Sequence, residues 1–588
     1  MMRLLDNASG VAGACVPSIT TVAMPLRVAS ARILRDLRWV LLTVLPVAMP
    51  LRAFAAPDST SYAVIPRPTV LTPRTGTFVL APSTVVLADP MFLSVARRFA
   101  RDVANPTGFD LRVVSVGDST SVLPGSQRIR LVRDNANAAL GDEGYQLDVT
   151  NTEVVVRAKS AAGAFYALET LKQLFPAAIY RDAPIGNVQW QAAAVHIEDV
   201  PRFAWRGAHL DAARHFMPKE FVKKYIDLLA RHKLNRFHWH LTEDQGWRIE
   251  ILKYPRLTDV ASCRTQTLVG RNETDPAKQV FDGKPHCGFY TQDDVREVVA
   301  YAAERYVTVV PEIEMPGHSQ AAISAYPELS SMPDTNPGVM RLWGVSEFIL
   351  NPDDRTISFM QDVLTEVLAL FPGPYIHIGG DEAVKTQWKQ SPSVQRRIKA
   401  LGLKDEHELQ SWFIRQMDGF LTTRGRRLVG WDEILEGGLA ENATVMSWRG
   451  MDGGIAAAKA GHDVVMAPGA YTYFDHYQSA DKKREPLAIG GFLPMDSVYA
   501  FEPVPPALTA AEATHVLGAQ AQLWTEYIQT PKDLEYMAFP RLVALSEVLW
   551  TGKGQRNFSD FMQRMAVHEL RLQALDVNYR KTKPVTMQ

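Results

Sequence analysis

The stretch Tyr375-Ile-His-Ile-Gly-Gly-Asp-Glu382 decides how this chain folds. Its apolar first half is typical of a buried strand. The two glycines then permit a tight turn or a close approach of the backbone to a ligand. Asp381 and Glu382 follow where the strand stops. Two structures fit this pattern: a strand that delivers acidic side chains to a pocket, or a turn in which Asp381 caps a helix.

The same pattern of an apolar strand with a polar or aromatic ending recurs eight times after residue 200. The predicted strands are Gly207–Asp211, Arg236–Leu241, Val307–Ile313, Tyr375–Ile378, Arg427–Gly430, Thr444–Ser447, Asp463–Met466 and His515–Ala519. Helical stretches lie between them, among them Lys219–Arg231, Thr291–Arg305, Thr356–Leu370 and His407–Arg424. Eight such units predict a (β/α)8 TIM barrel. An open doubly wound sheet is the alternative, but no GxGxxG or P-loop sequence follows a strand.

A barrel of this kind places functional residues at the C-terminal ends of its strands. Polar and aromatic residues do follow all eight predicted strands. In chain order they are Asp211 and Arg214; Glu243, Asp244 and Trp247; Glu314 and His318; Asp381 and Glu382; Trp431, Asp432 and Glu433; Trp448 and Arg449; Tyr473, Phe474 and Asp475; Trp524, Thr525 and Glu526. Each alone also fits a core or capping role, but together they predict one site.

This set of side chains predicts a pocket with apolar walls and a few orienting polar groups. Such a pocket suits a sugar, whose C–H faces lie on aromatic rings. Its hydroxyls would meet the acceptors Asp475 and Glu526 and the donor Arg206. Tryptophans that merely fill the core are the alternative. No CxxC or HExxH spacing occurs, so neither a metal nor another cofactor is expected.

The adjacent carboxylates indicate the type of reaction. Glycoside hydrolysis usually needs two carboxylates on opposite sides of the scissile bond. Neighbouring residues such as Asp381 and Glu382 diverge and fit that arrangement poorly. We expect Glu382 at the leaving oxygen and Asp381 at a ring substituent, which suits substrate-assisted hydrolysis.

A smaller α+β domain with an antiparallel sheet is predicted for residues 56–200, ahead of the catalytic barrel at 201–588 with its C-terminal helix. Tyr145–Val149 and Val154–Arg157 read as a hairpin, followed by a helix at Ala161–Phe175. We find no concentrated chemistry in this domain and expect a supporting or docking role.

Residues 1–55 are expected to be a signal peptide and leader. Three arginines precede an apolar run from Trp39 to Leu51, and Ala53-Phe54-Ala55 offers a small-residue cleavage site. A membrane anchor fits less well, because the run is short and contains prolines. We therefore predict export to the periplasm or the medium, with no stable membrane anchor and with translation starting at Met1 or Met24.

Cysteine usage agrees with export. Removal of the leader leaves Cys263 and Cys287, which bracket a polar loop that a disulfide would stabilise. Two unrelated thiols remain the alternative.

The charge balance bears on the partners. The 588 residues carry a formal net charge of −1, without the basic excess typical of nucleic-acid partners, so we expect none. A monomer or a homodimer is expected.

Several motifs in order resemble those of one enzyme family. They are His377-Ile-Gly-Gly-Asp-Glu382, Glu312-Ile-Glu-Met-Pro-Gly-His318, His240-Leu-Thr-Glu-Asp-Gln-Gly-Trp247, Gly430-Trp-Asp-Glu433 and Leu523-Trp-Thr-Glu526. The family that these motifs resemble is glycoside hydrolase family 20, the β-N-acetylhexosaminidases. The resemblance covers most of the chain, with the α+β segment similar to the family's accessory domain.

The resemblance implies an exo-acting, retaining reaction on a terminal N-acetylhexosamine of an oligosaccharide. The substrate's own acetamido oxygen attacks the anomeric carbon and forms an oxazolinium intermediate. Glu382 would be general acid and then base, with a raised pKa, and Asp381 would orient the acetamido group. The remaining roles implied are these: Tyr473 at the acetamido oxygen, Trp431, Trp448 and Trp524 as pocket walls, Arg206 and Glu526 at hydroxyls of the closed end, Asp475 at other ring substituents, and His318 with Glu243 as a relay behind Glu382.

One departure from the family pattern leaves a contact open. Many relatives have aspartate where this chain has Glu243, and Asp244 stands beside it. Either residue could reach His318. The choice between GlcNAc and GalNAc is also open.

Three other classes of protein compete with this interpretation. They are an exported glycan-binding protein without turnover, a structural surface protein and a chitinase. The chain has the proton donor that the first would lose, lacks the repeats of the second and lacks the DxxDxDxE ladder of the third.

Overall fold

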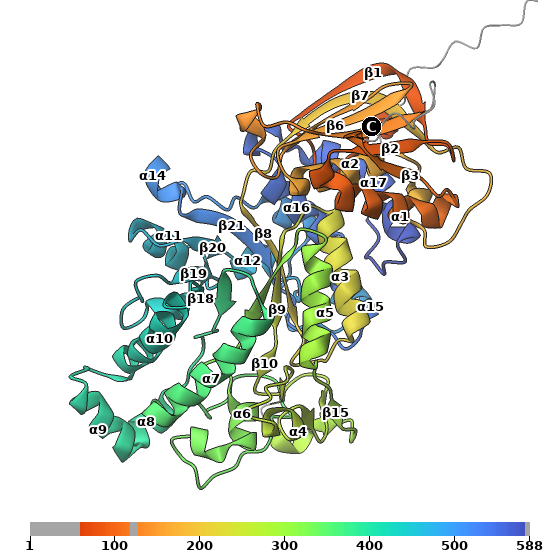
Figure 1. Cartoon of the computed structure of the whole chain (residues 1–588). Coiled ribbons are helices and arrows are strands. Elements are labelled where there is room, and N and C mark those ends of the chain that lie inside the picture. The colour runs from red at the N-terminus through yellow and green to blue at the C-terminus, as the bar shows by residue number, and fades with distance from the viewer. Residues whose placement is uncertain (1–58, 118–126, 274, 583–588) are drawn as a thin grey trace, which may run out of the picture. The chain divides into compact units, whose positions relative to one another are not determined.

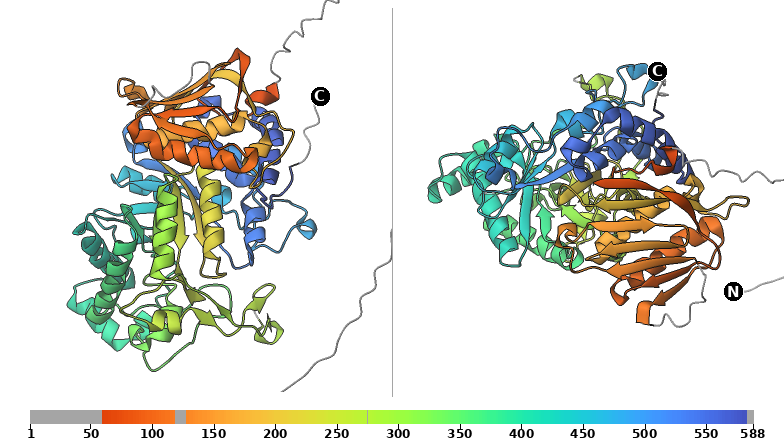
Figure 2. Two further views of the ribbon diagram at one scale, coloured as in Figure 1. Left: turned by 45° about the vertical axis from the view of Figure 1, so that its right-hand side comes forward. Right: turned by 90° about the horizontal axis from the view of Figure 1, so that it is seen from above.

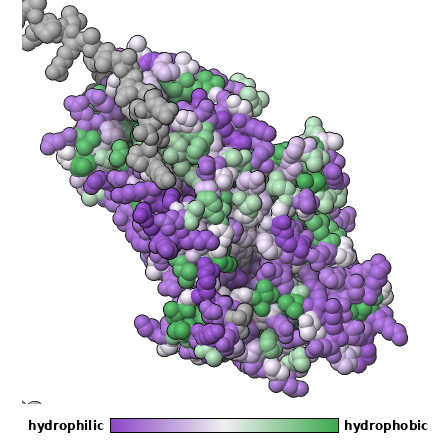
Figure 3. All heavy atoms as spheres, turned by 180° about the vertical axis from the view of Figure 1, so that it is seen from behind, coloured by the Kyte–Doolittle hydropathy of each residue, from purple (hydrophilic) through white to green (hydrophobic). Residues whose placement is uncertain are grey.

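The computed structural model describes residues 59–117, 127–273 and 275–582 (Figure 1). The predicted leader and its cleavage site lie outside these residues. On the face in Figure 3, hydrophilic side chains dominate and hydrophobic ones gather only in small groups. Among the described residues, no helix has both the length and the apolarity needed to cross a bilayer.

The first part of the described chain builds a seven-stranded sheet in the order β1-β7-β5-β6-β4-β2-β3 (Figure 2). Its strands are β1 (Val70–Val79), β2 (Val85–Ala88), β3 (Arg112–Ser115), β4 (Arg128–Arg133), β5 (Tyr145–Val149), β6 (Glu153–Ala158) and β7 (Gln191–Asp199). Helix α2 (Ala161–Leu174) begins at Ser160, whose hydroxyl accepts from two backbone N–H groups, and contacts β5 and β6. The α+β character and the β5–β6 hairpin agree with the sequence prediction.

The prediction of an antiparallel sheet is wrong for one half of it. β1, β7, β5 and β6 pair antiparallel, but β6, β4, β2 and β3 pair parallel. Parallel neighbours need a crossover connection. Helix α1 (Leu93–Thr107) supplies one such crossover, between β2 and β3.

The second part of the chain forms a closed barrel of eight parallel strands in the order β16-β17-β18-β19-β20-β21-β8-β9. They are β8 (Trp205–Asp211), β9 (Arg236–His240), β16 (Thr308–Glu312), β17 (Tyr375–His377), β18 (Arg427–Trp431), β19 (Thr444–Ser447), β20 (Val464–Met466) and β21 (Val516–Ala521). Every predicted barrel strand is present, with ends displaced by at most two residues. This result excludes the open doubly wound sheet.

The helices around the barrel strands include all four that were predicted. Those in this part of the chain are α3 (Lys219–Arg231), α4 (Arg256–Asp259), α5 (Gln292–Ala303), α6 (Gln320–Ala325), α7 (Asp354–Leu370), α8 (Thr386–Gln390), α9 (Pro392–Ala400), α10 (Glu406–Thr422), α11 (Asp452–Lys459), α12 (Gly469–Thr472), α13 (Met495–Ala500), α14 (Ala510–Ala513), α15 (Pro531–Ala538), α16 (Arg541–Trp550) and α17 (Phe558–Ala574).

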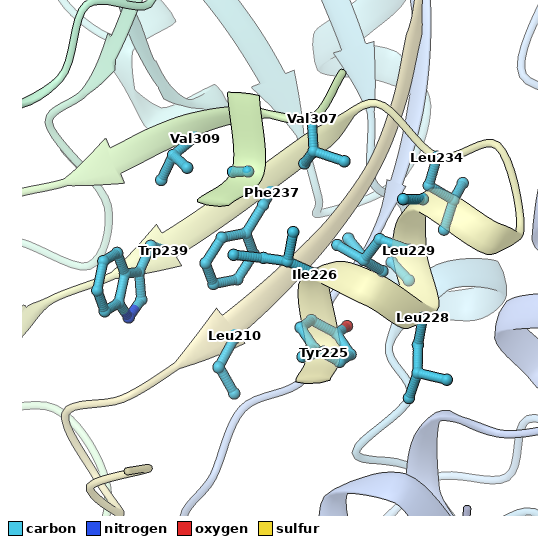
Figure 4. Packing of buried hydrophobic residues seen from close by; sticks show 14 of the residues in the cluster. Leu210, Tyr225, Ile226, Leu228, Leu229, Leu234, Phe237, Trp239, Val307 and Val309 are labelled. Carbon is cyan, nitrogen blue, oxygen red and sulfur yellow. The ribbon is translucent and has the colours of Figure 1, made fainter. Parts of the chain in front are cut away.

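Helix α3 illustrates how the barrel wall is packed. Its apolar residues recur at helical spacing, so that one face turns toward the strands. Figure 4 shows Tyr225 and Ile226 of α3 facing Leu210 of β8 and Phe237 of β9. All four side chains are fully buried. Burial of such a side chain contributes about 1.5–3 kcal/mol, which fixes the helix against the strands.

A disulfide joins Cys263 and Cys287. The two cysteines lie directly opposite each other in the antiparallel pair of short strands β12 (Cys263–Arg264) and β15 (His286–Cys287). Inside the loop that they close, β13 (Leu268–Val269) pairs with β14 (Val280–Phe281). Arg271 of this loop donates to the carbonyl of Ile489. The loop is therefore held at its base and at its tip.

Candidate active site

The backbone after β17 turns sharply at the two glycines. Gly379, Gly380 and Glu382 all have left-handed φ angles, of 65°, 91° and 44°. A Cβ at Gly379 would lie 1.6 Å from Oε2 of Glu314, so only glycine fits there. The following helix, α8, begins after Lys385. Asp381 is therefore not a helix cap, and the strand-end interpretation holds.

Behind Glu382 lies a short chain of charged groups. Its Oε2 is 3.4 Å from Nε2 of His318, and Nδ1 of His318 is 2.7 Å from Oε1 of Glu243. Asp244 is farther from the same ring nitrogen, at 3.4 Å. Its Oδ1 instead accepts from the backbone of Gln320. Of the two acids left open by the sequence, Glu243 makes the shorter contact with His318.

In this row of charged groups the proton resides on His318. Burial disfavours a charged imidazole, but Glu243 and Asp381 attract the proton and raise the pKa of His318 well above its usual value. The hydrogen bond with His318 lowers the pKa of Glu382. The sequence led us to expect a raised pKa for Glu382, and that expectation is wrong, because the imidazolium stabilises the carboxylate.

Asp381 is almost fully buried among other carboxyl groups. Its Oδ2 lies 3.6 Å from Nε2 of His318, and its Oδ1 has no protein partner. Burial and the nearby Asp381 raise the pKa of Glu314 well above its usual value and that of Glu433 to about 8. Both neighbours therefore hold their protons at neutral pH, so that they do not add further negative charge beside Asp381.

The predicted aromatic walls lie together. Trp431 and Trp524 belong to one buried cluster, with ring centroids 5.8 Å apart, and Trp448 and Tyr473 pack against it. The rings of Trp448 and Tyr473 stack at 6.1 Å. The Trp448 indole is also fixed at its edge, because its Nε1 donates to Glu433.

Three polar groups gather beside Trp524. The guanidinium of Arg214 lies 5.0 Å from the Trp524 ring and 3.0 Å from Glu243. Burial raises the pKa of Glu526, and the nearby Arg214 opposes that shift. Burial and the charge of Glu526 raise the pKa of Asp475 well above its usual value. Arg214, Asp475 and Glu526 thus lie close enough for their charges to interact.

Arg206 lies elsewhere, and its predicted place in the pocket is wrong. The residue stands near the start of β8, whereas the site forms at the ends of the barrel strands. Its guanidinium is fully buried and donates to Glu143 of the α+β domain, at 2.8 and 3.0 Å, and to the carbonyl of Phe203. Arg206 therefore holds the α+β domain to the barrel.

The sequence reasoning did not assign a role to Arg214, Glu314 or Glu433, although all three appeared among the residues that follow strands. The position of Arg214 relative to its strand could have indicated a role in the site. Arg214 comes three residues after Asp211, the last residue of β8, and so reaches the C-terminal face.

Comparison with known proteins agrees with this geometry. The profile "Glycosyl hydrolase family 20, catalytic domain" matches residues 203–553, and "Glycosyl hydrolase family 20, domain 2" matches residues 61–200. A β-hexosaminidase of Porphyromonas gingivalis is 44% identical over 519 residues. This alignment covers 88% of the chain but 64% of that protein, so the chain spans somewhat less than two thirds of its relative.

Solved structures give the same result. The family 20 β-N-acetylhexosaminidase of Streptomyces coelicolor A3(2) superposes with a TM-score of 0.76 at 32% identity, covering 90% of this chain and 99% of that one. A mutant Streptomyces plicatus β-hexosaminidase, solved in complex with its product GlcNAc, has a TM-score of 0.76 at 31% identity, covering 90% and 98%. On the strength of a catalytic-domain match over residues 203–553, the chain belongs to glycosyl hydrolase family 20.

Proposed function

We propose that this chain is an exo-acting, retaining β-N-acetylhexosaminidase that removes terminal N-acetylhexosamine by substrate-assisted catalysis. The observation that carries the proposal is the pairing of Asp381 and Glu382 on one turn, with Nε2 of His318 3.6 Å from the first and 3.4 Å from the second. One imidazolium thus lies beside both carboxylates, and we assign each carboxylate to a different atom of the substrate. Family membership supports the same reaction.

In the first step the acetamido oxygen of the substrate attacks the anomeric carbon while Glu382 donates its proton to the leaving oxygen. The bond to the leaving group breaks as the oxazolinium ring closes. Asp381 is the partner of the acetamido N–H, since its buried Oδ1 accepts no hydrogen bond from the protein. Its negative charge stabilises the positive charge that develops on the ring.

In the second step Glu382 takes a proton from water, which attacks the anomeric carbon and opens the oxazolinium ring. Two inversions at the same carbon retain its configuration. Trp431, Trp448 and Trp524 enclose the acetamido methyl group, and Tyr473 donates to the acetamido oxygen. The packing of all four side chains in one cluster supports these roles.

Glu382 must gain a proton before the first step. Its side chain is 39% exposed. A sugar bound beside Glu382 excludes solvent from its side chain and raises the pKa of the carboxyl group. The proton held by His318 is then drawn to Glu382, and Glu243 stabilises the imidazole through Nδ1. Binding and protonation are therefore coupled.

Arg214, Glu526 and Asp475 hold the hydroxyl groups of the non-reducing end. This proposal moves the role first expected of Arg206 to Arg214, which lies against the Trp524 ring. Arg214 and Asp475 are buried and Glu526 is half-buried, so hydroxyl groups held by these three residues belong to a terminal sugar, consistent with exo cleavage.

We also propose that the protein is exported, to the periplasm or the medium. The disulfide between Cys263 and Cys287 supports this location, because such bonds persist in oxidising compartments.

The test is hydrolysis of three 4-nitrophenyl glycosides by the chain from residue 56: the β-N-acetylglucosaminide, the β-N-acetylgalactosaminide and the β-glucoside. Cleavage of either acetamido sugar without the glucoside is expected, and their ratio gives the sugar preference. Cleavage of the glucoside at a similar rate would refute the substrate-assisted reaction.

A further inference from the structure

The centre of the barrel is charged where barrels of this kind are usually filled by branched apolar side chains. Five residues make up what we call the Glu312 cluster: Glu312 of β16, His209 of β8, His238 and His240 of β9, and His377 of β17. All five are fully buried. Burying a charge is costly unless it is paired and hydrogen-bonded, so a cluster of this kind indicates a role beyond filling space.

The carboxylate of Glu312 has both oxygens occupied by protein groups. Oε2 accepts from Nδ1 of His240 at 2.5 Å and lies 3.0 Å from Nε2 of His238. Oε1 accepts from Nε1 of Trp431 at 2.8 Å and lies 2.8 Å from Nδ1 of His377. Four nitrogens therefore surround the carboxylate of Glu312.

Among His209, His238 and His240, the surroundings favour the protonated form of His240 alone. Burial disfavours the charged form of His240, but Glu312 and Glu243 together raise its pKa to about 10. Burial lowers the pKa of His238 to about 4 and that of His209 well below its usual value. His240 is therefore an imidazolium between two carboxylates, and His238 and His209 are neutral at pH 7.

One arm of the cluster reaches the proton donor. Nε2 of His240 lies 3.2 Å from Oε2 of Glu243. Glu243 contacts His318 at 2.7 Å, and His318 contacts Glu382 at 3.4 Å. Glu243 thus has His240 on one side and His318 on the other, which leaves its carboxylate little freedom to rotate.

The other arm reaches the aromatic walls of the pocket. The Trp431 indole is held by Glu312 at its edge and by the His377 ring at 4.9 Å. The Trp524 ring lies 4.4 Å from His209 and 5.0 Å from His240. Both tryptophans therefore rest on imidazole rings of the cluster.

We propose that His240 and Glu312 are positioning residues. They fix the orientation of the proton-donating groups relative to the aromatic walls of the acetamido pocket. The inference rests on the roles proposed above for Glu382 and Trp431. Through Nε2, His240 orients Glu243 and hence His318. Through Nδ1, it orients Glu312 and hence Trp431. Neither residue touches the substrate.

Two substitutions of one residue separate the arms. In His240→Gln the amide nitrogen takes the place of Nε2, so the contact with Glu243 is kept and that with Glu312 is lost. In His240→Asn the amide nitrogen takes the place of Nδ1, so the contact with Glu312 is kept and that with Glu243 is lost. Loss of a supporting group behind a site typically lowers activity about 10- to 100-fold.

The two variants should fail in different ways. His240→Asn should hydrolyse a GlcNAc disaccharide far worse than the 4-nitrophenyl glycoside, because a sugar leaving group depends more on the acid. His240→Gln should lose both substrates equally, mainly in kcat. It should also lose affinity for a thiazoline analogue of the oxazolinium ring in proportion to kcat/KM.

Glu547→Gln is the matched control for general loss of stability. Glu547 is also a fully buried carboxylate, 2.6 Å from Arg564, and lies in α16. The Glu547→Gln substitution should lower the stability of the protein and leave kcat and the leaving-group dependence unchanged. If neither His240 variant folds, Glu312→Gln provides the test, with the thiazoline affinity reduced and the leaving-group dependence unchanged.

Identical substrate profiles for His240→Asn, His240→Gln and the wild type would overturn the inference, as would the same kinetic losses in Glu547→Gln. Wild-type thiazoline affinity in Glu312→Gln would overturn it too. Failure of the proposed function appears separately, as full activity of Glu382→Gln.

Discussion

Replacement of Arg214 should lower kcat/KM by orders of magnitude, whereas replacement of Arg206 should only weaken the fold. Both arginines are buried and both pair with a glutamate. Arg214 contacts Glu243 at 3.0 Å and lies over the Trp524 ring, but Arg206 contacts Glu143 at 2.8 Å, at the start of its strand. Arg214→Gln and Arg206→Gln therefore remove the same charge from opposite ends of β8.

The size of the effect follows from burial. Arg214 is 7% exposed and is held by both Glu243 and Asp211. Breaking a buried ion pair by removing one partner costs about 3–5 kcal/mol. If this loss falls on the transition state, kcat/KM drops by about two to three and a half orders of magnitude. For Arg206 the same loss should appear in the free energy of unfolding.

The assay is hydrolysis of 4-nitrophenyl β-N-acetylglucosaminide, with unfolding by urea measured on the same preparations. Arg206→Gln should keep kcat/KM and unfold at lower urea. Wild-type kcat/KM in Arg214→Gln would refute the assignment of Arg214 to the pocket. A loss of turnover in Arg206→Gln without loss of stability would refute the structural role of Arg206.

Three further predictions concern the glycine turn, a buried histidine and the disulfide. Gly379→Ala should be inactive and less stable by more than about 1 kcal/mol, because a Cβ would meet Glu314 and the left-handed φ is strained; activity and urea unfolding check both. Stability should fall as the pH drops from about 6.5, the usual His pKa, to about 4, the folded pKa of His232, since the unfolded state binds the proton first. His232→Asn should flatten that fall in urea titrations at several pH values, and an unchanged slope would contradict it. Replacing Cys263 and Cys287 by serine should cost about 3 kcal/mol, from the separation of 24 residues that the bond closes; no change in urea stability would argue against that cost.

The barrel could be predicted from the sequence because each strand is a short apolar run with a distinct ending. The prediction of the first domain's sheet was less complete. The strands β4, β5 and β6 are close in sequence, and their hairpin dominated the pattern. Parallel pairing of β2 with β4 joins residues more than 40 positions apart, and no local signal reports such a contact.

The candidate site was predictable in its membership but not in its contacts. Trp431, Trp524, Asp381 and Glu382 could be named because each follows a strand. The prediction for Arg206 was wrong because it rested on the residue type and not on the position along the strand. Arg206 lies near the start of β8, before the residues that reach the C-terminal face. The lowered pKa of Glu382 depends on a hydrogen bond with His318, some 60 residues away in the chain, and a sequence pattern does not reveal that contact.

The contacts of the Glu312 cluster could not be predicted from the sequence either. His238 and His240 alternate along one strand, which places both side chains inside the barrel. Their meeting with Glu312, His209 and His377 depends on the order of strands around the barrel. A sequence gives the alternation, but only the closed sheet brings the four strands' side chains to one point.

The most direct test of the reaction is the rate of hydrolysis of 4-nitrophenyl glycosides whose acetamido methyl group carries zero, one, two or three fluorines. Fluorine withdraws electrons from the acetamido oxygen and weakens it as a nucleophile. If this oxygen attacks the anomeric carbon, kcat/KM should fall steeply and steadily with each added fluorine. A rate that is independent of fluorination would contradict substrate-assisted catalysis and point to a nucleophile in the protein.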